Sequence, residues 1–214
     1  MENKTILFDL DGTLTDSGEG ITKCAELALR HFGLPIPPQD RMRTFVGPPL
    51  RETFMKFGVK EEDVEEAIRV YRSRYTTVGK FENFPYPGIR EMLEKLRGDG
   101  HRLFVATSKP EDMSIEILEK FNLAHFFEII AGATREKGRD SKEAVIAYLL
   151  GQTGDVGKAI MVGDTAYDVR GAAVHAIPTI GVAWGYGEIS DMVDAGAAAI
   201  ASDPQNLYDL LSRM

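Results

Sequence analysis

Apolar residues follow two different patterns along the chain. Short continuous apolar runs, which are typical of strands buried on both faces of a sheet, predict strands at residues 5–10, 102–107, 128–131, 159–163 and 179–183, with a weaker one at 197–201. Apolar residues spaced three or four positions apart predict helices at residues 89–96, 111–121, 141–150, 168–176 and 204–211. This alternation predicts an α/β fold with a parallel sheet and right-handed crossovers.

Residues 16–82 carry helical spacing and no strand pattern. The predicted helices lie at residues 17–32, 38–45, 50–57 and 64–75, and Gly47-Pro48-Pro49 breaks the chain between the second and the third. Because this segment follows directly on the first predicted strand, we interpret it as a helical insertion into the α/β domain. The predicted domains are therefore residues 1–15 with 83–214, and residues 16–82.

The first predicted strand ends in two acids, Asp9 and Asp11, and Gly12 then allows a sharp turn. Burying an unpaired carboxylate costs several kcal/mol by order of magnitude, so we expect a cation beside Asp9. The ligand crevice of an open α/β sheet lies outside the carboxyl ends of its strands, where this pair falls. A calcium loop is excluded, since Leu14 and Gly20 stand where it needs glycine and glutamate. A hairpin turn that carries surface acids is the alternative interpretation of this stretch, although apolar and polar residues do not alternate on its two sides.

The charge of the chain is unevenly distributed. The 214 residues carry a net charge of -8, which argues against binding to bulk nucleic acid. Residues 16–82 hold 11 basic and 11 acidic residues, so the whole excess of acid lies in the rest of the chain. This distribution suits a cation held by the acidic part and arginines of the insertion that meet an anionic substrate.

Two further observations concern location and the single cysteine. No apolar run approaches the roughly 20 residues of a membrane helix, and the first residues lead into a strand rather than a signal peptide. We therefore expect a cytoplasmic protein that does not contact membranes. Cys24 cannot form an internal disulfide, and its helical spacing with Ala28 favours packing over catalysis.

Other polar residues follow the predicted strands, where a sheet of this type brings them towards Asp9. Thr107 and Ser108 end a strand before a predicted helix, whose N-terminus attracts anions; an ordinary helix cap is the alternative. Lys142 stands at the start of another predicted helix, where the helix dipole disfavours a cation unless an anion lies beside it. An exposed surface lysine is the alternative there.

A second acidic pair, Asp164 and Asp168, follows the apolar run at residues 160–163. Hard cations such as magnesium take oxygen ligands in proteins. Two strand-end carboxylates, completed by waters and a phosphate oxygen, make a suitable set of ligands. The sequence therefore predicts a Mg²⁺ site.

The order of these parts resembles the haloacid dehalogenase superfamily over essentially the whole chain. The resemblance rests on Asp-x-Asp-Gly-Thr at residues 9–13, Thr-Ser at 107–108, Lys142, and Gly-Asp-x-x-x-Asp at 163–168. It implies a Rossmann-like three-layer α/β/α core with a parallel sheet and an inserted α-helical cap domain. Residues 45–50 and 181–187 look most like the phosphoglycolate phosphatase-like group, which includes 5'-nucleotidases.

The resemblance implies a magnesium-dependent phosphatase whose partner is a small-molecule phosphate ester. Asp9 would be the nucleophile that forms an aspartyl-phosphate, and Asp11 would act as general acid and then as general base. The implied magnesium ligands are Asp9, the backbone carbonyl of Asp11, and Asp164. Asp168 either binds the cation directly or contacts the groups that do. The implied phosphate-binding groups are Lys142, Thr107 and the N–H groups near Gly12 and Ser108.

The substrate is less well defined by the sequence. Ser108 stands where phosphoglycolate phosphatases commonly have asparagine, so the chain departs from the pattern of that group at this position. Arg51, just after the break at residues 47–49, is either a contact to a second anionic or polar group of the substrate or an exposed helix arginine. A monomer and a homodimer are both compatible with the sequence.

Three alternative functions stay open at this point. A haloalkanoate dehalogenase uses a similar aspartate without a metal, but Asp11 as a proton donor argues against it. A phosphomutase would isomerise a sugar phosphate instead of hydrolysing it. A phospho-accepting regulatory protein would combine similar residues without turnover, so release of many equivalents of phosphate per protein would exclude it.

Overall fold

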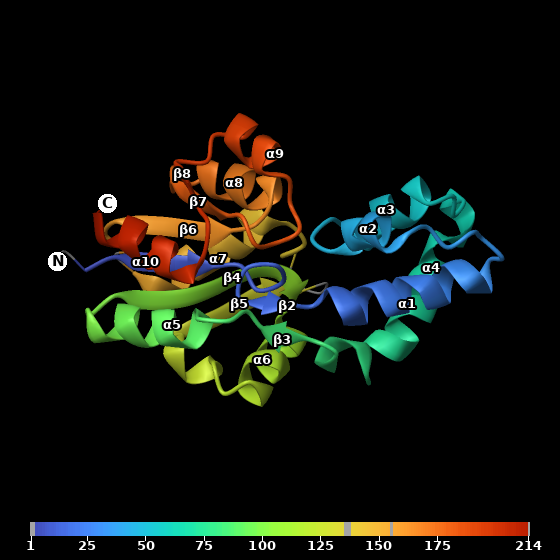
Figure 1. The fold of residues 1–214 in the computed structure, drawn as a ribbon, viewed down its shortest axis with the longest axis horizontal. Coiled ribbons are helices and arrows are strands. Elements are labelled where there is room, and N and C mark those ends of the chain that lie inside the picture. The colour runs from blue at the N-terminus through green and yellow to red at the C-terminus, as the bar shows by residue number, and fades with distance from the viewer. Residues whose placement is uncertain (1–2, 135–137, 155, 214) are drawn as a thin grey trace. The chain divides into compact units, whose positions relative to one another are not determined.

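The computed structural model describes residues 3–134, 138–154 and 156–213 (Figure 1). Contacts between residues divide the chain into two compact units. The first, which we call the core unit, comprises Met1–Thr15 and Pro85–Met214, and the second, the helical unit, comprises Asp16–Phe84. The core unit resumes at residue 85, two residues after the predicted residue 83.

The core unit contains a six-stranded sheet in the order β5-β4-β1-β6-β7-β8. Each pairing between neighbouring strands of this sheet is parallel. The strands are β1 (Thr5–Phe8), β4 (Arg102–Pro110), β5 (Ile129–Ala133), β6 (Ala159–Gly163), β7 (Thr179–Val182) and β8 (Ala199–Ala201). The predicted α/β fold with a parallel sheet is confirmed, and β1 lies at its centre.

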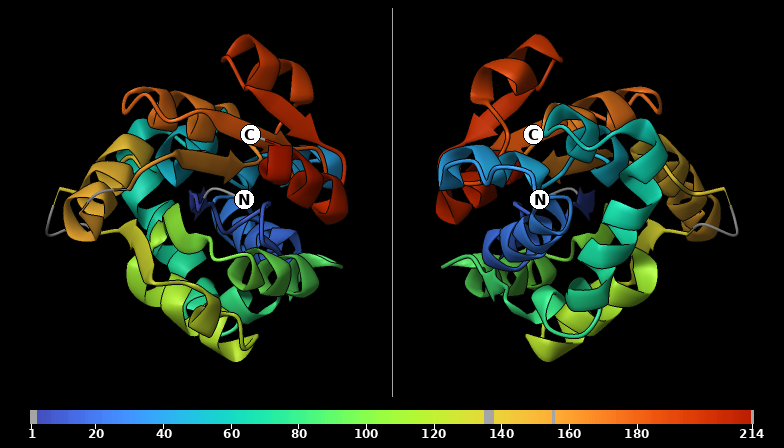
Figure 2. Two further views of the ribbon diagram at one scale, coloured as in Figure 1. Left: turned by 90° about the vertical axis from the view of Figure 1, so that its left-hand side faces the viewer. Right: turned by 90° about the vertical axis from the view of Figure 1, so that its right-hand side faces the viewer.

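Helices cover both faces of this sheet, which gives three layers (Figure 2). Ile6 and Phe8 of β1 pack in one hydrophobic cluster with α5 (Ile89–Gly98) and α10 (Pro204–Arg213). Leu7 packs on the opposite face, in a cluster with α7 (Lys142–Thr153) and α8 (Ala166–Ala173). The continuous apolar run of β1 is therefore explained by burial on both faces.

The helical unit contains α1 (Gly18–His31), α2 (Gln39–Met42), α3 (Leu50–Lys56) and α4 (Val64–Tyr75). Single 3₁₀ turns at Arg43–Phe45, Glu61–Asp63 and Gly79–Phe81 connect or extend these helices. Its interior is aromatic: Phe54 makes edge contacts with Phe45 and Tyr71, and Tyr71 stacks on Tyr75. Cys24 is buried in α1, so its predicted packing role agrees with its position.

Two element boundaries near the site differ from the prediction. Strand β4 continues to Pro110 and α6 (Glu111–Lys120) begins at its predicted residue, so Thr107 and Ser108 are strand residues and not helix caps. Helix α8 begins at Ala166, which places Asp168 in its first turn instead of at a strand end. A short helix α9 (Ile189–Asp194), together with a two-stranded sheet of β2 (Thr15–Asp16) and β3 (Phe84–Pro85), was not predicted.

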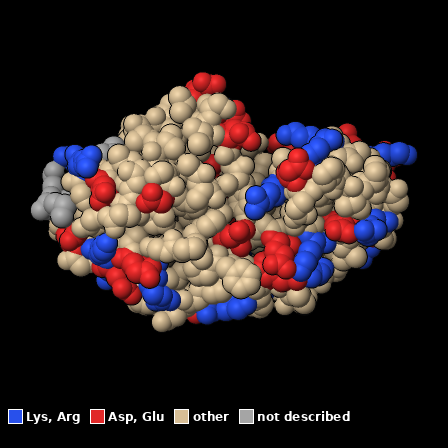
Figure 3. Space-filling model, viewed as in Figure 1, with Lys and Arg blue, Asp and Glu red and all other residues tan. Residues whose placement is uncertain are grey.

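The surface and the helix lengths bear on possible partners. Within the described ranges, no helix is long and apolar enough to cross a membrane. On the face drawn in Figure 3, Lys and Arg side chains are interspersed with Asp and Glu side chains. The predicted location and oligomeric state stay predictions.

Candidate active site

The site is built by three adjacent strands that end side by side. Phe8 of β1 is in register with Val105 of β4 and with Val162 of β6. Asp9 therefore follows β1 at the edge where β6 leads into Asp164, and its N–H donates to the carbonyl of Val162 at 2.9 Å. Parallel strands present their carboxyl ends at one edge, so acids far apart in the sequence meet there.

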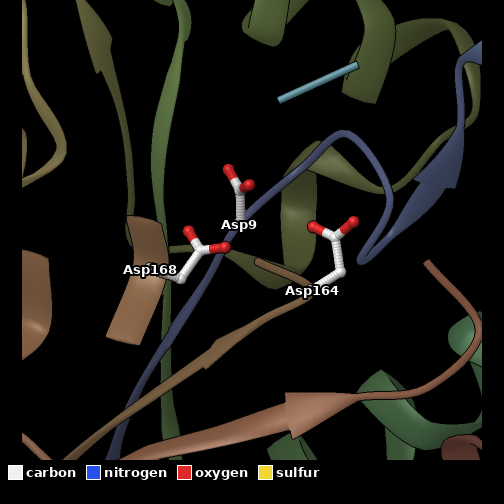
Figure 4. A group of neighbouring side chains, drawn as sticks. All are labelled: Asp9, Asp164 and Asp168. Carbon is white, nitrogen blue, oxygen red and sulfur yellow. The ribbon is translucent and has the colours of Figure 1, made fainter. Parts of the chain in front are cut away.

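Three carboxylates form a compact acidic cluster at this edge, made of Asp9, Asp164 and Asp168. Figure 4 shows their side chains turned toward the same space from the end of β1, the end of β6 and the first turn of α8. Each offers an oxygen that lies within 4.8 Å of the other two, and all three residues are buried. Such a group of oxygen donors matches the ligand preference of a hard divalent cation.

Lys142 is the cation that balances part of this charge. Its Nζ lies 2.8 Å from Oδ1 of Asp9 and 2.7 Å from Oδ1 of Asp168, and it donates to the carbonyl of Ala106 at 3.0 Å. Burial lowers the pKa of the Lys142 ammonium, but the charges of Asp168 and Asp9 outweigh burial and raise that pKa above its ordinary value. The surface alternative is excluded, because Lys142 is buried at the start of α7 beside the anions that its position predicted.

Asp168 has protein partners on both oxygens. Oδ2 accepts from the N–H of Thr165 at 3.1 Å and from its hydroxyl at 2.8 Å, which fixes the first turn of α8. Oδ1 faces the ammonium of Lys142. Asp168 therefore links the start of α8 to the lysine that contacts Asp9.

The acidic cluster carries more carboxylates than Lys142 alone balances. Burial, together with the charges of Asp168 and Asp9, raises the pKa of Asp164 well above its usual value. Burial also raises the pKa of Asp168, although Lys142 acts in the opposite direction. Three ionised carboxylates against one ammonium leave an excess of two negative charges, so the donor set fits a divalent cation in charge as well as in ligand type.

Asp11 forms a separate ion pair that the sequence did not predict. Its Oδ2 lies 2.7 Å from Nζ of Lys109, whose side chain is only 4% exposed. Oδ1 of Asp11 is buried and accepts no hydrogen bond from the described residues. The signal for Lys109 was its place two residues after Thr107, which puts both side chains on the same side of an extended strand.

Gly12 has a geometric reason to be glycine. Its φ is +85°, and a Cβ at this position would lie 2.1 Å from Oδ2 of Asp164. The loop after β1 turns tightly here, since the N–H of Gly12 donates to the carbonyl of Thr15 at 2.8 Å. A side chain would therefore displace an acid of the cluster.

The remaining predicted residues lie in different environments. Thr107 is buried in β4, its Oγ1 accepts from the N–H of Lys109 at 3.3 Å, and Ser108 between them is exposed. Arg51 belongs to the helical unit, where its guanidinium lies 2.6 Å from Oε1 of Glu65 and is half exposed. The substrate contacts proposed for Thr107, Ser108 and Arg51 stay predictions.

Comparison with known proteins identifies the class to which this fold and site belong. The family model described as haloacid dehalogenase-like hydrolase matches residues 6–182. The chain therefore belongs to the haloacid dehalogenase-like hydrolases, and the phosphatases among its relatives identify it as a phosphatase.

Individual relatives carry several names. The chain is 42% identical to the tyrosine-protein kinase PtkA of Mycobacterium tuberculosis, over 96% of this chain and 70% of that protein. It is 41% identical to a 5'-nucleotidase of Pseudomonas aeruginosa, over 87% and 86% of the two chains. A solved structure described as a predicted phosphatase from Clostridium acetobutylicum is 39% identical and covers 100% of both chains, with a TM-score of 0.93.

These findings confirm the resemblance seen in the sequence. The superfamily is the one that the acidic motifs indicated, and the relatives include both phosphoglycolate phosphatases and a 5'-nucleotidase. The similar structures also confirm the α/β fold of the core.

Proposed function

We propose that this protein is a magnesium-dependent phosphomonoester hydrolase that acts on a small phosphorylated metabolite through an aspartyl-phosphate on Asp9. The observation that carries the proposal is the placement of Asp9 at the end of β1, buried among Asp164, Asp168 and the Lys142 ammonium. A carboxylate attacks phosphorus only when the negative charge of the phosphate is neutralised, and this site concentrates the groups that do so.

Magnesium would be held by Asp9, Asp164 and the backbone carbonyl of Asp11, with Asp168 supporting the site through Lys142. When bound, the cation supplies charge neutralisation and orients the phosphate. Lys142 provides a second positive charge next to the nucleophile. Thr107 and the N–H groups near Gly12 and Ser108 bind phosphoryl oxygens in this proposal.

The reaction then proceeds in two steps at Asp9. An oxygen of Asp9 attacks the phosphorus, the bond from phosphorus to the alcohol oxygen breaks, and a protonated Asp11 gives its proton to that oxygen. Water next attacks the phosphorus while Asp11 takes a proton from it, the bond from phosphorus to Asp9 breaks, and inorganic phosphate leaves. Oδ1 of Asp11, buried without a hydrogen-bond partner among the described residues, is the oxygen available for these transfers.

The helical unit would act as a cap that sets specificity for the leaving group, in the manner of phosphoglycolate phosphatase-like or 5'-nucleotidase-like enzymes. Arg51 on α3 is our candidate contact to a second anionic group of the substrate. Arg51→Ala should lower kcat/KM on the physiological substrate by about 10-fold, the scale of one lost charged hydrogen bond, and leave a small generic ester nearly unchanged. An unchanged ratio of the two kcat/KM values would remove Arg51 from the site.

The test of the proposed function is phosphate release from a panel of phosphorylated metabolites, with magnesium and with a chelator. We expect many turnovers per protein with magnesium, none with the chelator, and none for Asp9→Asn under either condition. Acid-quenched wild-type enzyme should carry phosphate on Asp9. Wild-type rates in the Asp9→Asn variant would overturn the mechanism, and full activity in the chelator would restore the metal-free dehalogenase alternative.

The relative named as a tyrosine-protein kinase supports a second candidate function. The same aspartate can pass a phosphoryl group to a tyrosine hydroxyl instead of to water, provided that a phosphate donor such as ATP loads Asp9. Incubation with radiolabelled ATP and a tyrosine-containing protein distinguishes phosphoryl transfer to tyrosine from transfer to water. Label on tyrosine that depends on Asp9 indicates transfer, whereas label only in free phosphate indicates hydrolysis.

A further inference from the structure

The segment after β7 lies against the acidic cluster without contributing a carboxylate to it. We call residues 183–187, Ala-Trp-Gly-Tyr-Gly, the Trp-Gly loop. The chemistry proposed above uses none of its side chains. Its sequence nevertheless contains the only tryptophan of the chain between small residues, and its backbone passes directly beside Asp164.

Both oxygens of Asp164 accept hydrogen bonds, one from this loop and one from Thr13 in the loop after β1. The N–H of Tyr186 donates to Oδ2 of Asp164 at 2.9 Å. The hydroxyl of Thr13 lies 3.4 Å from Oδ1 of the same carboxylate. Thr13 is itself held by the loop, because the indole N–H of Trp184 donates to its carbonyl at 3.0 Å.

The glycines allow the backbone of the loop to come this close. A Cβ on Gly185 would lie 2.2 Å from Cβ of Asp164 and 2.6 Å from the carbonyl oxygen of Gly12. A Cβ on Gly187 would lie 2.1 Å from the carbonyl oxygen of Asp164. Neither site could hold a side chain without moving Asp164 or the loop after β1.

The carboxylate of Asp164 requires partners that fix its orientation. It is 1% exposed, and the negative charges of Asp9 and Asp168 lie close to it. Without fixed partners, repulsion would favour rotation of its carboxylate away from the other two acids. A divalent cation binds well only where its ligands already point at one position.

We propose that the Trp-Gly loop is a positioning element of the metal site, which holds the Asp164 carboxylate in the orientation that binds a divalent cation. Trp184 acts through Thr13, and Gly185 acts by allowing close approach of the backbone. This inference rests on the proposed magnesium site but assigns a role to residues outside it. Loss of groups that orient metal ligands typically weakens metal affinity by about 10- to 100-fold.

The test is direct titration of the metal-free protein with MgCl₂ by calorimetry, without any substrate. Gly185→Ala should raise the Kd for Mg²⁺ by about 10-fold or more, and Trp184→Phe, which keeps a ring and removes the N–H, by several-fold. Each variant should also show a smaller rise in Tm on addition of Mg²⁺ than the wild type.

Two matched controls separate positioning from general damage. Gly151→Ala adds a methyl group to α7, where, among the described residues, nothing beyond the adjoining helix backbone lies within 4 Å of the new Cβ. Tyr208→Phe removes an aromatic hydrogen-bond donor that lies 2.8 Å from Asp99. Both should bind Mg²⁺ as the wild type does.

The outcomes distinguish this inference from the proposed function. If the wild type binds Mg²⁺ and folded Gly185→Ala and Trp184→Phe bind it within 2-fold of the same Kd, the loop is only a packing element and the inference is wrong. If Gly185→Ala does not fold, Trp184→Phe decides. If the wild type itself binds no Mg²⁺, the proposed metal site fails and the inference fails with it.

Discussion

At the scale of single residues, the site consists of buried acids with two buried lysines between them. Lys142 faces Asp9 and Asp168, and Lys109 faces Asp11. Because these side chains are largely buried, removing the lysine from either pair leaves an uncompensated negative charge. Such a charge strongly lowers the stability of the folded protein. The proposed nucleophile Asp9 and the proposed proton donor Asp11 thus face different lysines.

The proposed acid–base role of Asp11 predicts a dependence on the leaving group. General acid–base catalysis contributes roughly 10² to 10⁴ in rate, so Asp11→Ala should lose about that much on an alkyl phosphate. An activated ester such as p-nitrophenyl phosphate needs less protonation of its leaving oxygen and should lose less. The measurement is kcat/KM on both esters in both proteins, and equal losses would count against the acid role.

The Lys109–Asp11 pair predicts non-additive effects on stability. Lys109→Met should lower the free energy of unfolding by about 1–3 kcal/mol, since a mostly buried carboxylate loses its charged partner. Adding Asp11→Asn should recover part of that loss, because the uncompensated charge is then removed. Urea unfolding of the wild type, both single variants and the double variant measures the coupling. The exposed Lys95→Met serves as control, and additive effects would show that the pair is not coupled.

At the scale of elements, the alignment of β1, β4 and β6 decides which residues meet. Asp9 and Asp164 leave neighbouring strands at the same edge of the sheet, and Thr107 and Lys109 alternate with exposed Ser108 along β4. A shift of one residue in the β1–β4 register would exchange the faces of these side chains. The opposite edge of the same strands holds a different buried group, His101.

The junction before β4 predicts a pH dependence of stability. Nδ1 of His101 accepts from the N–H of Lys4 at 3.1 Å, Nε2 is buried and has no hydrogen-bond partner in the part of the chain that the structure describes, and burial lowers the pKa of His101 below its ordinary value of 6.5. The unfolded chain therefore binds more protons than the native state below about pH 6.5. The contribution of His101 is complete above that pH and decreases as the pH falls toward its native pKa.

A substitution isolates this contribution. His101→Asn keeps an acceptor for the N–H of Lys4 and cannot take up a proton. Its Tm should fall less between pH 7 and pH 5 than that of the wild type, measured by thermal unfolding at each pH. His125→Asn, at an exposed position, should follow the wild type. Parallel curves for all three proteins would exclude a role for His101.

At the scale of the whole molecule, one sheet edge gathers buried negative charge that a bound cation would stabilise. The core unit carries the whole net charge of the chain, and its acidic cluster is buried. In the metal-free protein, the same buried charges that suit a cation therefore lower the free energy of unfolding. A site of this kind is typically less stable empty than a neutral variant of the same shape.

Asp164→Asn tests this opposition. In the absence of metal the variant should unfold at a higher temperature than the wild type, by about 2 °C or more, because a buried charge near Asp9 and Asp168 is removed. The wild type should gain about 2.7 kcal/mol at a Mg²⁺ concentration 100 times its Kd, and the variant much less. Calorimetric scans with chelator and with MgCl₂ give both values; a less stable metal-free variant would contradict the argument.

The sequence by itself determined most of the elements and the acids of the site. An apolar run that ends in Asp9, and another that ends in Asp164, are local signals, because burial of a strand and the chemistry of its end depend on neighbouring residues in the chain. The signal for Lys142 is local as well, since a cation at a helix start needs an anion nearby. The parallel sheet, the helical insertion and the magnesium hypothesis follow from signals of this kind.

The tertiary structure alone decided which partners these residues have. The bond between Lys109 and Asp11 joins positions 98 residues apart, and the contact of Trp184 with Thr13 spans 171 residues. No local pattern encodes such distances, because they depend on strand order, register and the path of each loop. The ion pair between Asp168 and Lys142 was likewise not encoded locally. It arises from the packing of α7 beside α8 and not from the place of Asp168 after a strand.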